Sequence, residues 1–141
     1  MPNPIRLRPT LLAIDDSKSQ CAFYRIVLGR FGKVRTVDTL DEFFAMGACA
    51  DLIILATHLV GEGQKMEDVL AKLTATAPVL LSEAYPQDRA ARPYHSERVV
   101  GHWRRGGDHE HLCWLVDRAL GSASPAVLPA PTYLCSSKGS L

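Results

Sequence analysis

The chain has 141 residues, a formal net charge of +1, 47% hydrophobic residues and 22% charged residues. This length fits one domain with one hydrophobic core. The near-zero net charge provides no overall field toward nucleic acid or an anionic membrane, and no apolar run approaches the roughly 20 residues that span a bilayer.

The first nine residues contain three prolines and no hydrophobic periodicity, which predicts an extended leader over 1–9. They lack the apolar core of a signal peptide, so export is not expected. No metal-ligand spacing relates the four cysteines, which are Cys21, Cys49, Cys113 and Cys135. This usage fits a reducing compartment, and we expect the protein to be cytoplasmic.

A first strand and helix follow the leader. Residues 10–15 form a short apolar run that ends in acids, as a buried strand does. Ser17 stands three residues before Gln20, a capping-box spacing that begins a helix. Apolar residues then recur at helical intervals as far as Phe31, and Gly32 is placed as a C-terminal glycine cap.

The next elements repeat this order. Residues 33–38 alternate charged and branched side chains and predict a half-buried strand. Thr39 and Glu42 have the capping-box spacing again, which begins a short helix. Residues 52–55 are uninterrupted aliphatic, as in a parallel strand covered on both faces.

The second half of the chain continues the alternation. A glycine-containing loop over 61–63 precedes a helical stripe over 66–73 and a fourth short strand over 79–81. Prolines interrupt any helix between 83 and 97. Residues 98–103 predict a fifth strand.

A last helix is predicted over 108–120, with Gly121 as its cap. Residues 122–141 are rich in Ser, Pro, Ala and Gly and predict a flexible tail.

Repeated alternation of strand and helix predicts an α/β fold: a doubly wound, five-stranded parallel sheet with helices on both faces, in three layers. One domain would span 10–121. In such sheets function gathers at the carboxyl ends of the strands. The residues at those ends are Asp15, Asp16, Ala56, Thr57, Ser82 and Glu83.

Three segments in this order resemble the response-regulator receiver domain, the CheY-like form of the flavodoxin-like fold. They are the acid pair Asp15-Asp16 before Ser17, the strand and loop over 51–63, and the strand over 78–84. Leu59-Val-Gly-Glu-Gly63 fits the family's Leu-Pro-Gly-x-Gly loop, with valine in place of proline. The resemblance covers about Thr10 to Gly121.

The resemblance implies a phosphorylation site in which three carboxylates hold magnesium, a strand hydroxyl senses the phosphate and a lysine neutralises it. Here Ala56 stands at the position of the phosphate acceptor. Glu83 stands at the hydroxyl position, and Ser82 lies one residue before it. Arg104 stands near the lysine position, with Trp103 or Arg105 as the alternatives one residue away. The degenerate acidic pocket would comprise Asp15, Asp16, Ala56, Ser82, Glu83 and Arg104.

A methyl group cannot accept a phosphoryl group, and the loss of one oxygen ligand should weaken magnesium binding strongly. We therefore expect no catalytic residue, no metal and no cofactor: a pseudo-receiver rather than an enzyme. Helix capping is the alternative role for Asp15 and Asp16. Thr57 and His58 do not replace the acceptor, because Thr57 points to the opposite face of the strand and a loop histidine is usually solvated.

The second notable feature is an arginine-rich segment between residues 89 and 105 that also carries aromatic rings. Arginine with tyrosine and tryptophan suits either a protein hot spot or a nucleotide, whose base stacks on rings and whose phosphates pair with guanidinium groups. In receivers this region forms the fourth-helix, fifth-strand output face. The candidate binding residues are Arg89, Arg92, Tyr94, Trp103, Arg104 and Arg105.

Two functions remain open. The first is a phosphorylation-independent signalling adaptor in a bacterial two-component or related pathway, with a protein partner such as a histidine kinase, a phosphotransferase or a flagellar component. The second is a cyclic-di-GMP effector that uses the same segment. DNA binding is not expected, since no helix-turn-helix region remains once the fold is assigned, and neither is a membrane partner.

Overall fold

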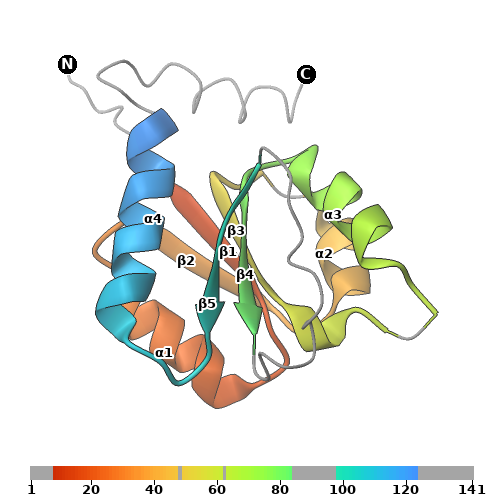
Figure 1. Cartoon of the computed structure of the whole chain (residues 1–141), viewed down its shortest axis with the longest axis horizontal. Helices are drawn as coiled ribbons and strands as arrows, with labels where there is room; N and C mark the ends of the chain where they lie inside the picture. Colours follow the sequence, from red (N-terminus) through yellow and green to blue (C-terminus); the bar gives the residue numbers. More distant parts are fainter. Residues whose placement is uncertain (1–7, 48, 62, 84–97, 124–141) are drawn as a thin grey trace.

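The computed structural model describes residues 8–47, 49–61, 63–83 and 98–123. Within these residues, five parallel strands form one sheet in the order β2-β1-β3-β4-β5 (Figure 1). This is the flavodoxin-like, doubly wound order, so the predicted fold class is confirmed. The strands are β1 Thr10–Ile14, β2 Lys33–Val37, β3 Leu52–Ala56, β4 Val79–Glu83 and β5 Val99–Arg104.

Helices cover both faces of the sheet, which makes three layers (Figure 1). Helices α1 Lys18–Leu28 and α4 His109–Ala123 lie on one face, and α2 Leu40–Met46 and α3 Met66–Thr74 lie on the other. A short 3₁₀ turn, η1 Thr57–Leu59, follows β3.

Alternate residues of β1 point to opposite faces, as strand geometry requires. Leu11 and Ala13 belong to the core beneath α1 and α4, whereas Leu12 and Ile14 belong to the core beneath α2 and α3. Both faces are therefore apolar, which explains why this strand reads as a continuous aliphatic run.

Both predicted helix starts are confirmed. The hydroxyl of Ser17 accepts a hydrogen bond from the Gln20 backbone N–H at 3.1 Å, and the hydroxyl of Thr39 accepts one from Glu42 at 3.0 Å. The capping role therefore belongs to Ser17 and to neither preceding aspartate, which corrects the alternative role suggested for that pair.

Two predicted helix ends are wrong. Helix α1 ends at Leu28, four residues before Gly32. A Cβ on Gly32 would lie 2.2 Å from the Pro9 carbonyl oxygen, so this glycine permits a close backbone approach and caps no helix. Helix α4 continues past Gly121 to Ala123, because the predicted cap lies within regular helix.

Residues 84–97, which include the interrupted segment between the fourth and fifth strands, lie outside the described residues, as do 1–7 and 124–141. Among the described helices, none combines the length and the apolar character that crossing a bilayer requires.

Candidate functional site

The sheet brings the carboxyl ends of its strands together at one edge. Ile14 of β1 pairs with Leu55 of β3, so the next residues along these strands, Asp15 and Ala56, lie beside one another. Ala56 in turn pairs with Ser82 of β4. This edge therefore holds three of the residues that the sequence placed in the degenerate acidic pocket.

Asp15 is fully buried at this edge, with a side chain that is 0% exposed. Its Oδ1 atom accepts hydrogen bonds from the Ser17 backbone N–H at 2.9 Å and from the Arg105 guanidinium at 3.3 Å. Among the described residues, its Oδ2 atom has no hydrogen-bond partner. A buried carboxylate needs charge compensation, and Arg105 supplies it on one side only.

Asp16 and His58 meet at the same edge. The Nε2 atom of His58 lies 2.8 Å from Oδ1 of Asp16, and its Nδ1 atom lies 3.3 Å from a guanidinium nitrogen of Arg105. A guanidinium can only donate, so Nδ1 accepts and the ring proton sits on Nε2, which donates to Asp16. This hydrogen bond lowers the pKa of Asp16 below 3.8. We call Asp15, Asp16, His58 and Arg105 the edge cluster.

Ala56 is the last residue of β3 and is 1% exposed. Its side chain is a methyl group with neither acid nor nucleophile. Thr57, the next residue, directs its hydroxyl toward the carbonyl oxygen of Ser82 at 3.4 Å. The edge therefore carries no carboxylate at the end of β3.

Ser82 lies beneath this edge and contacts α1. The hydroxyl of Tyr24 donates a hydrogen bond to Oγ of Ser82 at 2.9 Å, and both side chains are fully buried. Burial raises the pKa of Tyr24 to about 12. The Ser82 hydroxyl is therefore occupied by a core hydrogen bond.

Glu83 and Arg104 do not join the edge cluster. Glu83 is 5% exposed, and its Oε2 atom lies 2.8 Å from Nδ1 of His102. Arg104 is exposed, whereas Arg105 contacts Asp15. The cation that contacts Asp15 is thus Arg105, the first residue after β5 and the one-residue alternative to the predicted Arg104.

Trp103 is wrongly predicted as part of a binding surface. It is 2% exposed, its ring stacks on Phe23 with centroids 5.7 Å apart, and its indole N–H donates to the Asp108 carbonyl at 3.0 Å. A buried indole with a satisfied N–H is a core residue. The other predicted binding residues Arg89, Arg92 and Tyr94 lie outside the described residues.

Two residues of the site were not predicted. His58 was expected to be solvated. Tyr24 was recognised only as one of the apolar residues that recur at helical intervals along α1, and its hydrogen bond to Ser82 was not predicted. The one available signal for His58 was its place two residues after the end of β3. Its contact with Asp16 joins residues 42 positions apart, which no local pattern encodes.

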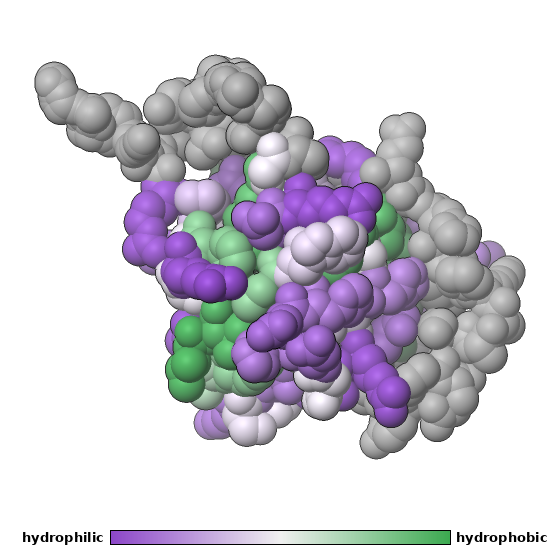
Figure 2. Space-filling model, turned by 60° about the vertical axis from the view of Figure 1, so that its left-hand side comes forward, coloured by the Kyte–Doolittle hydropathy of each residue, from purple (hydrophilic) through white to green (hydrophobic). Residues whose placement is uncertain are grey.

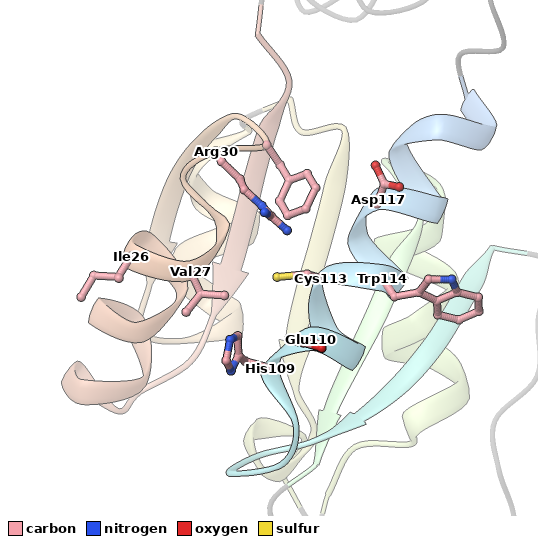
Figure 3. A pocket seen from close by; sticks show the side chains of 9 residues that line it. Ile26, Val27, Arg30, His109, Glu110, Cys113, Trp114 and Asp117 are labelled. Carbon is pink, nitrogen blue, oxygen red and sulfur yellow. The ribbon is translucent and has the colours of Figure 1, made fainter.

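A groove lies between α1 and α4, and Figure 3 shows the side chains that line it. The face drawn in Figure 2 carries both hydrophobic and hydrophilic surface. This groove has a volume of about 770 Å³. Cys113 points toward α1, whereas the Trp114 ring lies on the other side of α4 (Figure 3). The lining mixes both charges with apolar side chains and selects no ligand class; it comprises Ile26, Val27, Arg30, Phe31, His109, Glu110, Cys113, Trp114 and Asp117.

No protein-family model matches the sequence, and no curated protein matches it. Solved structures do match the fold, and several of them are described as receiver domains or response regulators. The signal receiver domain of an HD domain-containing protein from Pseudomonas fluorescens Pf-5 aligns with a TM-score of 0.70 at 16% identity, over 85% of this chain and 92% of that chain.

A response regulator from Thermotoga maritima aligns with a TM-score of 0.64 at 16% identity, over 82% and 99% of the two chains. The N-terminal domain of a response regulator/sensory box/GGDEF three-domain protein from Carboxydothermus hydrogenoformans aligns with a TM-score of 0.59 at 24% identity, over 79% and 93%. These likenesses establish the receiver-domain fold.

The edge cluster does not fit the magnesium ion that the receiver resemblance implied. Magnesium requires near-octahedral oxygen ligands. The cluster offers two carboxylates, an imidazole nitrogen and a guanidinium that already contacts Asp15, and β3 ends in a methyl group. The donor set is therefore poorer in oxygen and carries a fixed positive charge.

Proposed function

We propose that this chain is a cytoplasmic, non-enzymatic, receiver-like signalling adaptor that works without phosphorylation of an aspartate. It would act by protein contact in a two-component or related pathway. The observation that carries the proposal is Ala56, whose methyl group lies at the end of β3, next to Asp15. Transfer of a phosphoryl group to a carboxylate at this position requires an acid that the chain lacks.

The edge cluster supports the same proposal. In a phosphorylated receiver the cation after the fifth strand is needed for the phosphate. Here the Arg105 guanidinium already lies 3.3 Å from Asp15 and 3.3 Å from His58. The Ser82 hydroxyl is likewise occupied by Tyr24. The groups that would respond to a phosphate thus have partners within the protein.

The arginine-rich segment from 89 to 105 remains the proposed docking region, without Trp103. Arginine is enriched at protein hot spots, and Arg104 is exposed at the end of β5. A partner such as a histidine kinase, a phosphotransferase or a flagellar component would present an acidic surface to it.

Cyclic di-GMP is the second ligand proposed for this segment, and it is the weaker candidate. A GGDEF protein is named among the structural neighbours, but those words describe that protein. Burial of Trp103 removes one of the two rings that were expected to stack on a base. Calorimetric titration with the dinucleotide separates the two proposals, because only the effector would release heat that Arg104→Ala reduces.

The experiment that tests the adaptor proposal is incubation with acetyl phosphate and magnesium, followed by phosphate-affinity electrophoresis. A receiver domain that retains its acceptor aspartate is the positive control. The proposal predicts no retarded, phosphorylated band for this protein. A retarded band that persists after acid treatment, or one that is lost in Asp15→Asn or Asp16→Asn, would contradict it.

A further inference from the structure

The face shared by α1 and α4 exposes apolar surface around its groove. Ile26 of α1 is 80% exposed, and it lines the groove together with Val27 and Phe31, which are half-buried. Cys113 of α4 points toward α1 from the opposite wall (Figure 3). An exposed aliphatic side chain beside other apolar groups marks a surface that buries further area when a partner binds.

The two walls of this groove carry opposite charges. The stretch 17–37, which includes α1, contains several basic residues and no acid. Arg30 is its cation in the groove lining, whereas α4 contributes the exposed acids Glu110 and Asp117. Among the described residues, no ion pair joins Arg30 to either acid, and its guanidinium lies over the Phe31 ring, 4.7 Å from the ring centroid. These charges therefore face solvent and can pair with those of a partner.

The arrangement of these charges is complementary to itself under a two-fold rotation. Arg30 and Asp117 lie at the same end of the groove on opposite walls, and Ile26 lies farther along α1 (Figure 3). A two-fold axis that runs along the groove places α1 of one copy against α4 of the other and preserves each level along the groove. Arg30 of each copy then faces Asp117 of the other, which gives two contacts of opposite charge in one isologous interface.

We propose that the groove between α1 and α4 is the interface of a homodimer with this two-fold arrangement. The Ile26 side chain of each copy packs against the apolar lining of the other copy's groove, and the Arg30–Asp117 contacts fix the orientation. A second copy suits the mixed lining better than a small molecule does, because small-molecule sites are mostly apolar with few polar groups. This face is separate from the docking region proposed within residues 89–105.

The size of the face determines how strong this dimer is. Helices of 11 and 15 residues are about 16 Å and 22 Å long, and two packed side by side are about 20 Å wide. A face of about 20 Å by 20 Å on each copy buries roughly 800 Å² in total, before the relief of the side chains is added. Specific interfaces begin at about 1,000 Å², so we expect a reversible dimer with a dissociation constant in the micromolar range.

The test is sedimentation velocity of the full chain at concentrations up to about 100 μM, above the range expected for an interface of this size. We expect reversible dimerisation. Arg30→Asp and Asp117→Arg should each raise the dissociation constant by more than about tenfold, because either change makes both charge contacts repulsive. Ile26→Ser should weaken the dimer by removing its apolar anchor. Arg35→Asp makes the same charge change on exposed β2, outside the groove, and is the matched control.

Mixing the Arg30→Asp and Asp117→Arg variants gives the decisive result. In the mixed dimer one contact has both charges reversed and the other has neither, so we expect association to return. Misfolding of either variant cannot imitate this rescue. A chain that stays monomeric at every concentration would overturn the proposal, including the case in which residues 124–141 or an unrelated protein occupy the groove. So would a dimer that the groove variants leave unchanged, or a mixture that stays monomeric.

Discussion

Replacement of the buried Trp103 by alanine should destabilise the protein strongly. An aromatic side chain buries about 150–250 Å² of surface, which at roughly 25 cal/mol per Å² corresponds to about 4–6 kcal/mol. Measured losses for Trp→Ala in cores are about 3–5 kcal/mol. Trp103 is 2% exposed, stacks on Phe23 and donates to Asp108, so we expect a loss of about 4 kcal/mol in the free energy of unfolding.

The matched control is Trp114, the other tryptophan of the chain, which is 54% exposed. It stacks on His111 and lies beneath the Arg118 guanidinium, contacts worth about 1 kcal/mol at a surface. Urea unfolding followed by far-ultraviolet circular dichroism measures both variants. If Trp103→Ala costs no more than Trp114→Ala, Trp103 does not belong to the core, and its role in a binding surface is restored.

Three further predictions concern single groups. The pKa of Tyr24 is raised from 10 to about 12. The stability that this shift contributes is therefore complete below pH 10 and is lost, by up to about 3 kcal/mol, as pH rises to about 12. In Tyr24→Phe, the free energy of unfolding should fall less steeply with pH in this range. Gly32→Ala should destabilise by about 2–3 kcal/mol because its Cβ has no room, whereas Gly121→Ala, in open helix, should stabilise by about 0.5–1 kcal/mol in urea unfolding. Because the pKa of Asp16 is lowered, the stability that its carboxylate contributes is present above pH 3.8 and is lost as pH falls further. In His58→Ala, an NMR titration of the Asp16 carboxyl group should show its titration midpoint moving up toward 3.8.

Features encoded by local chemistry were predictable from the sequence. The Ser17 and Thr39 caps depend on hydrogen bonds that span three residues, so spacing alone reveals them. The aliphatic strands were visible because both faces of a parallel sheet are covered. Helix ends were less predictable, since Gly32 is fixed by a close approach to Pro9 and not by its own helix.

The edge cluster was only partly predictable. Strand ends placed Asp15, Asp16 and Ala56 at one edge, because parallel strands share their direction. The contact between Asp15 and Arg105 joins residues 90 positions apart and depends on where β5 ends. An error of one residue in counting along a strand exchanges the side chains assigned to its two faces. Such an error led to the prediction of Arg104 in place of Arg105.

Burial of Trp103 was hidden for a related reason. Its neighbours His102, Arg104 and Arg105 are polar, so the segment resembles a charged surface in sequence. In the sheet, alternation sends Trp103 to the face beneath α1, where Phe23 meets it. Trp103 is the one fully buried residue of β5, so this strand gives no clear periodic signal.

In the proposed adaptor, no group at this edge of the sheet captures a phosphoryl group. A titration of ¹⁵N-labelled protein with fluoroberyllate and magnesium tests it most directly, because this complex mimics an aspartyl phosphate. We expect the amide resonances of Asp15, Ala56 and Ser82 to keep their positions throughout the titration. New resonances for these amides at saturating fluoroberyllate would contradict it.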